Sequence, residues 1–160
     1  MQTRSTYGFG TSLALPLDQA VEQVTAALKK EGFGILTTID VRQTLKQKLD
    51  VEWEPYVILG ACNPPLAHRA LTAVHDIGLL LPCNVVVHQH GAESRVEVAD
   101  PLAMLGIVQD DTLREVAEET RARLERALQH LHTGRKVVTP SSPSLLAQEA
   151  GGVSQNADIR

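Results

Sequence analysis

Two Cys-Asn dipeptides, Cys62-Asn63 and Cys83-Asn84, are the residues of this sequence best suited to chemistry. The first ends an apolar run, and Pro64 then opens a predicted helix. A helix N-terminus favours anions and lowers the pKa of a nearby thiol, although the prolines there remove N–H donors that would hold an anion. Cys62 is therefore an activated thiolate or ligand contact, or else a small buried side chain beside a helix-capping Asn63.

Histidines near these dipeptides give weaker signals. His68 lies in the helix predicted after the first dipeptide, where it either lines a cleft or faces solvent. His68 and His75 are about 10.5 Å apart along a helix axis, which is too far for one metal ion. His88 and His90 share one side of a predicted strand, but two ligands are fewer than a stable zinc site uses. The sequence therefore predicts no metal site.

Known catalytic and cofactor signatures are missing from the sequence. Gly8-Phe9-Gly10 lacks the further glycines and the Lys-Ser/Thr ending of a phosphate-binding loop. The sequence also has no Gly-x-Ser-x-Gly elbow, zincin helix or EF-hand loop. The cofactor is therefore unknown at this stage, and whether the protein is an enzyme stays open.

Composition argues against several classes of function. The 160 residues include 15 Lys and Arg against 19 Asp and Glu, a net charge of −4, and 3% are aromatic. We therefore expect no nucleic-acid partner, because such proteins show a basic excess or exposed stacking rings. The longest apolar stretch, 77–87, is interrupted and shorter than the roughly 18 residues of a membrane span, so we expect no membrane partner. Two cysteines and a polar N-terminus indicate a cytoplasmic protein with reduced thiols.

Hydrophobic periodicity predicts the elements that position the two dipeptides. An apolar run over 56–61 is interpreted as a strand buried on both faces, and it leads into the first dipeptide and a helix over 64–75. A strand over 79–88 carries the second dipeptide, with a bulge indicated by Pro82. Alternation along that strand predicts that Cys83 faces the core and that the next residue faces the other way.

The remaining pattern predicts one domain over 1–135 and a flexible tail over 136–160, because the tail is rich in Pro, Ser and Gly. Within the domain we expect strands over 7–15, 33–39 and 94–99, with the last joined to its predecessor as a hairpin. Helices are expected over 17–30, after Asp40, after Asp100 and from Asp110 or Asp111 to Gly134.

Several stretches, in order along the chain, carry a family resemblance. They are Tyr7–Thr11, Glu31–Thr37, Thr44–Lys46, Tyr56–Pro64, Gly78–Val86 and the closing Asp100-Pro101. Over about residues 5 to 132 the chain resembles the bacterial and archaeal family called domain of unknown function 302. Both Cys-Asn dipeptides are hallmarks of that family, and His68 matches its helix.

The resemblance implies a fold and a partner rather than an activity. It implies an α+β protein with an antiparallel sheet covered on one side by helices, in a TATA-binding-protein-like topology, and pairing as a homodimer. The family has no established activity, and a fold by itself does not fix a function.

Three hypotheses for the function follow. The first is a non-enzymatic binding module that holds a small molecule or anion in a pocket near the Cys-Asn-Pro-Pro segment, lined by Cys62, Asn63, His68, Cys83 and Asn84. The second is a thiol-dependent redox or transfer enzyme that uses both cysteines, with His68 as base. The third is a structural homodimer whose interface is its function. The placement of the cysteines discriminates between them, because a disulfide needs Cα atoms within about 7 Å.

Overall fold

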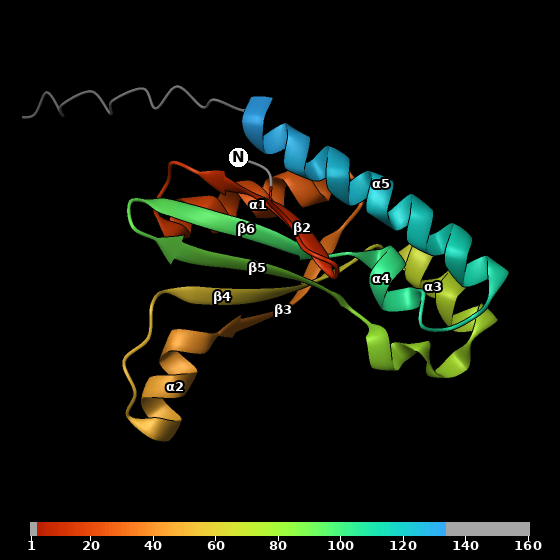
Figure 1. Cartoon of the computed structure of the whole chain (residues 1–160), viewed down its shortest axis with the longest axis horizontal. Coiled ribbons are helices and arrows are strands. Elements are labelled where there is room, and N and C mark those ends of the chain that lie inside the picture. Colours follow the sequence, from red (N-terminus) through yellow and green to blue (C-terminus); the bar gives the residue numbers. More distant parts are fainter. Residues whose placement is uncertain (1–2, 134–160) are drawn as a thin grey trace, which may run out of the picture.

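A single antiparallel sheet organises the computed structural model, which describes residues 3–133 of the chain (Figure 1). Its strands are β1 (Thr3–Arg4), β2 (Gly8–Leu13), β3 (Gly34–Asp40), β4 (Tyr56–Cys62), β5 (Cys83–His90) and β6 (Glu93–Ala99). They lie in the order β1-β2-β6-β5-β4-β3, and each neighbouring pair is antiparallel. The tail predicted over 136–160 lies outside the described residues.

Helices lie between and after the strands, and four of the described helices begin at polar caps that the sequence predicts. They are α1 (Leu17–Lys30), α2 (Val41–Leu49), α3 (Pro64–Ala73), the 3-10 helix η1 (His75–Leu80), α4 (Pro101–Leu105) and α5 (Asp111–Thr133). The carboxylates of Asp40, Asp100 and Asp110 each accept a hydrogen bond from a backbone N–H of the following helix, at 2.8 to 2.9 Å. These caps satisfy N–H groups that have no partner within the helix.

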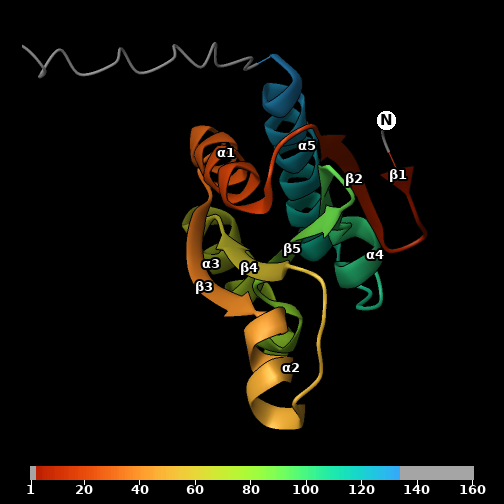
Figure 2. The same ribbon diagram turned by 90° about the vertical axis from the view of Figure 1, so that its left-hand side faces the viewer.

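One face of the sheet carries the main hydrophobic core. The register aligns Phe9 with Val98, Val98 with Val85, and Val85 with Leu59, so apolar side chains form a row across four strands. Helices α1 and α5 cover this face (Figures 1 and 2). They contribute the buried residues Ala20, Val24, Ala27, Leu28, Leu124, Ala127, Leu128 and Leu131. The fold is therefore α+β, with an antiparallel sheet covered on one side by helices, as predicted.

The other face of the sheet is more open. Ile58, Val86 and Glu97 are neighbours on it by register, and all three are only half-buried. Only 59–61 of β4 is buried, which corrects the prediction of a strand buried on both faces. An antiparallel sheet can leave one face to water, whereas burial on both faces is typical of parallel sheets.

A second, smaller core lies beyond one end of the sheet, where α3, η1 and α4 meet the first turns of α5 (Figure 1). Its buried members are Leu66, Ala70, Ile77, Leu105, Leu113, Val116 and Ala117. The stripe of apolar residues along α5 thus serves two cores, because this helix is long enough to pass over the sheet and reach beyond it.

The chain between α3 and β5 differs from its predicted form. The helix predicted over 64–75 ends at Ala73, and the strand predicted over 79–88 begins only at Cys83. Between them η1 buries Ile77 and leaves Leu79 85% exposed. A short apolar run does not distinguish strand from helix by its pattern, and here packing against α3 favours the helical form. The bulge predicted at Pro82 is not found within β5, which begins after that residue. A register shift occurs instead in β3, between Ile35 and Thr37.

Candidate functional site

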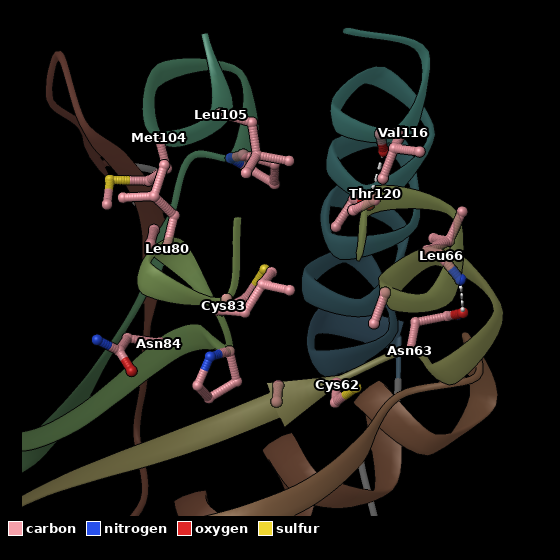
Figure 3. Close-up of a pocket in the computed structure, with 18 of the residues that line it drawn as sticks. Cys62, Asn63, Leu66, Leu80, Cys83, Asn84, Met104, Leu105, Val116 and Thr120 are labelled. Carbon is pink, nitrogen blue, oxygen red and sulfur yellow. Dashed lines mark hydrogen bonds between the residues drawn. The ribbon is translucent and has the colours of Figure 1, made fainter. Parts of the chain in front are cut away.

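A cavity of about 430 Å³ lies at the end of the sheet, between the sheet, α3, η1, α4 and α5 (Figure 3). Its size falls in the range of small-molecule sites. Most of its wall is aliphatic, and this wall includes Leu66, Leu80, Leu81, Met104, Leu105 and Val116. Among the described residues, no Asp, Glu, Lys, Arg or His lines it.

Asn63 lies at the cavity wall, but its side chain is committed to the fold. Its Oδ1 accepts a hydrogen bond from the backbone N–H of Leu66 at 3.3 Å, which caps α3. Its Nδ2 donates to the backbone oxygen of Glu31 at 3.4 Å, which ties this corner to the end of α1. Asn63 is 6% exposed, so these contacts satisfy a buried amide. Its main role is structural.

The two cysteines both line the cavity but come from opposite faces of the sheet. The ladder pairs Cys83 with Ala61. Because neighbouring residues alternate, Cys83 lies on the helix-covered face and Cys62 lies on the other. The prediction that Cys83 faces the core agrees with this register, and both thiols are free. This placement argues against a pair of cysteines that form a disulfide within the chain.

Burial controls the protonation of both thiols. It raises the pKa of Cys62. For Cys83, burial together with a smaller electrostatic contribution from Cys62 raises the pKa to about 11. Both groups are therefore neutral thiols at pH 7, and the helix N-terminus does not activate Cys62. A neutral thiol is a poor nucleophile, so this environment does not favour thiol catalysis.

Asn84 is the polar side chain of the cavity wall that keeps its hydrogen-bonding capacity. It is exposed, lies opposite Gly60 in the ladder and has no side-chain hydrogen bond within the described residues. Thr120 also lines the cavity, but its hydroxyl donates to the backbone oxygen of Val116 at 2.7 Å. Figure 3 shows Asn84 on the side of the cavity away from α5, whereas Thr120 lies on α5 itself.

His68 lies apart from the other predicted site residues. Its side chain is exposed on α3, and it is not part of the cavity wall. The neighbouring Arg69 forms ion pairs with Glu115 and Glu119 of α5, at 3.4 and 3.3 Å. The structure thus gathers Cys62, Asn63, Cys83 and Asn84 around one cavity and leaves His68 on the surface.

Sequence reasoning missed the aliphatic wall from η1, α4 and α5. The sequence predicts Leu80 and Leu81 in a strand, whereas Leu80 ends η1 and Leu81 follows it. Met104 and Leu105 belong to a helix of one turn. Val116 and Thr120 lie in the helix expected from Asp110 or Asp111 to Gly134, and the periodicity of one helix does not show that they line a cavity. The apolar stripe of α5 is longer than the sheet face that the helix covers. This extra length is the feature of the sequence that could have indicated a second group of apolar residues beyond the sheet.

No cluster of three or more His, Cys, Asp and Glu side chains suited to a metal ion occurs in the part of the chain that the structure describes. Within the same part, no helix combines the length and the apolar character needed to cross a membrane.

The fold and the cavity define a class: an α+β protein whose single antiparallel sheet ends at a largely aliphatic cavity. The chain belongs to the family named Domain of unknown function DUF302, whose model matches residues 9–131. A crystal structure of an uncharacterised conserved DUF302 protein from Bacillus stearothermophilus is similar to it, with 29% sequence identity and a TM-score of 0.74. That similarity covers 79% of this chain and 99% of the other. Among curated proteins, none matches the chain.

Proposed function

We propose that this protein is a non-enzymatic binding module for a small, uncharged and largely apolar molecule held in the cavity at the end of the sheet. The observation that carries the proposal is a cavity of about 430 Å³ with an aliphatic wall and a few polar groups, which is the usual form of a small-molecule site. An empty apolar cavity of this size destabilises a fold, so a ligand that fills it would be stabilising.

The cavity wall favours an uncharged ligand over an anion. The described wall has no cationic side chain, and two prolines remove N–H donors from the first turn of α3. The Asn63 amide already accepts from one of the N–H groups that remain. Burying an unpaired charge in such a wall is costly, so the anion half of the first hypothesis has little support.

The thiol enzyme is the weaker alternative. Burial keeps Cys62 and Cys83 neutral, and His68 is exposed on α3 and does not line the cavity, so it is poorly placed to serve them as a base. The free thiols instead support a cytoplasmic location, because reduced cysteines persist in that compartment.

Binding of Nile red, an uncharged apolar dye that fluoresces when it leaves water, tests the proposal. Ala67 lines the cavity from α3, whereas Ala73, at the end of the same helix, is exposed and not part of the wall. We expect saturable binding of one dye per chain, loss of binding in Ala67→Phe, and unchanged binding in the matched control Ala73→Phe. Absence of saturable binding to the wild type, or equal binding by both variants, would refute the cavity as the site.

We also propose that the chain forms a homodimer through the β3 edge and α2. The outer side of β3 is unpaired within the described chain, and none of the residues of α2 is buried. Figure 2 shows α2 projecting away from the helices that cover the sheet. Ile39, Leu49 and Trp53 are about half exposed or more along this region. An unguarded edge strand beside exposed apolar side chains is a surface on which a second chain can pair. Light scattering should return twice the chain mass of 17.4 kDa; a monomer mass at micromolar concentration would contradict the pairing.

A further inference from the structure

We propose that the ligand of the cavity is an aliphatic chain with a single uncharged polar end, such as a hydroxyl or amide. This inference rests on the proposed binding function and names the class of molecule that the wall selects. Three features carry it: the kind of apolar side chains in the wall, the state of its polar groups, and the composition of its rim.

The wall is aliphatic rather than aromatic. Phe33 is the one aromatic residue among the described residues that line it, and leucines dominate the remainder. Flat ring systems are held in proteins largely by stacking on aromatic faces. Leucine and methionine side chains instead adapt to a flexible chain through many weak dispersion contacts. The wall therefore favours a flexible aliphatic body, whereas a planar dye such as Nile red is held there by apolar burial alone and is displaced by a better-fitting chain.

The polar groups of the wall leave one position for a polar end. Asn63 and Thr120 use their side chains within the fold. The thiols are neutral and weak hydrogen-bonding groups. Asn84 keeps both a donor and an acceptor, and its exposure places it at the rim. An uncharged hydroxyl or amide satisfies such a side chain, whereas a carboxylate there would have no cation among the lining residues to pair with.

Exposed apolar side chains form the rim and give such a chain a path into the cavity. Leu36, Leu71, Leu79 and Met104 all line it, and they are 66%, 40%, 85% and 37% exposed. They come from β3, α3, η1 and α4, so the apolar rim spans several elements. An aliphatic molecule entering here keeps apolar contact, with its body directed between α3, α4 and α5 and its polar end at the rim. Figure 3 shows the Asn84 amide at that outer side, directed away from α5.

A series of straight-chain primary alcohols tests the inference by displacement of Nile red. Burial of one methylene stabilises binding by an amount that corresponds to about a fourfold gain in affinity. We expect affinity to rise about fourfold per methylene until the cavity is full. Decanol should bind at least tenfold more tightly than decanoate at pH 7. The carboxylate of decanoate would lose hydration at a wall that has no cationic side chain among the described lining residues to pair with it. Ala67→Phe should shorten the longest chain that still gains affinity, and Ala73→Phe should leave the series unchanged.

The Asn84→Ala variant tests the polar end separately. It should weaken decanol about three- to tenfold, the worth of one hydrogen bond, whereas Ala73→Phe, outside the wall, should leave decanol binding unchanged. Saturable dye binding with no dependence on alcohol chain length, or with decanoate equal to decanol, would overturn the ligand class and leave the binding function standing. No binding of the dye or of any alcohol would overturn both.

Discussion

Asn63 lines the cavity, but its side chain stabilises the fold and is not free to bind a ligand. It caps α3 through its oxygen and reaches the end of α1 through its nitrogen. We expect Asn63→Ala to destabilise the protein by about 0.5–2 kcal/mol, the cost of losing a helix cap. Thermal unfolding measures this. Asn63→Asp keeps the capping oxygen and loses the donor, so it should fall between the wild type and the alanine variant; equality of all three would refute the capping role.

The thiols provide a second residue-scale prediction. Burial raises the pKa of both, and that of Cys83 to about 11. We expect iodoacetamide at pH 7 to alkylate Cys62 faster than Cys83 and both more slowly than a free cysteine, because only the thiolate reacts. Site-resolved mass spectrometry of the native protein, with Cys62→Ser and Cys83→Ser as controls, gives the two rates. A Cys62 that reacts faster than free cysteine would restore the thiol enzyme as a candidate.

Glu31 links stability to pH. Burial alone raises the pKa of Glu31, but hydrogen bonds from His130 and Arg126, each at 3.1 Å, outweigh it and hold this pKa below its ordinary 4.5. A carboxylate with a lowered pKa stabilises the fold above its unfolded-state pKa and loses that contribution as pH falls through the folded-state value. The contribution of Glu31 is therefore present at neutral pH and lost in acid.

Glu31→Gln should accordingly lower the melting temperature at pH 7 by about 2–8 °C, since it loses charge-assisted hydrogen bonds. The difference from the wild type should shrink as pH falls from 5 to 3. Melting curves across that range are the measurement. A difference that stays constant from pH 7 to pH 3 would show that the carboxylate charge is not what stabilises this contact between α1 and α5.

At the scale of elements, the close approach of β2 and β6 depends on Gly10. A Cβ there would collide with the backbone oxygen of Val96, which belongs to the neighbouring strand and cannot swing away. Gly10→Ala should therefore destabilise the protein by about 1–3 kcal/mol, the usual cost of overpacking. Gly34→Ala is the matched control, because no heavy atom beyond its two chain neighbours lies within 4 Å of the position its Cβ would take. Chemical denaturation should separate the two variants; equal stability would contradict the close packing.

At the scale of the whole molecule, the edge strand β3 and the helix α2 have few packing contacts within one chain that would account for their stability. An isolated helix of nine residues is marginal in water, and most helical stability comes from packing of an apolar face. A partner over this region would provide that packing. Ile39 is 48% exposed on the edge strand, so a charge there would oppose pairing without disturbing the core.

We therefore expect Ile39→Lys to shift the protein from dimer to monomer in light scattering at micromolar concentration. Ile107→Lys places the same charge on an exposed aliphatic side chain that follows α4 and does not line the cavity, and it should leave the dimer intact. If both variants keep the wild-type mass, the β3 edge is not the interface.

The sequence by itself determined most of the helices and strands, and the resemblance to the family implied a sheet covered on one side by helices. Helix starts could be predicted at Asp40, Asn63 and Asp100, because a cap is a local interaction between residues two or three apart. The α5 stripe could be predicted because its period is a property of one helix. Membership of the family followed from motifs that are contiguous in the chain.

Only the tertiary structure decided the cavity. Its wall joins β3 to α5 through residues as distant as Leu36 and Val116, and no local pattern records which apolar residues face one another across that space. The run around Leu79 became a 3-10 helix because Ile77 packs into the second core. Which helix face meets the cavity was likewise set by packing, since α3 turns Leu66 inward and His68 outward. Local sequence specifies local hydrogen bonds and periodicity, whereas a cavity is the space left between elements after they pack.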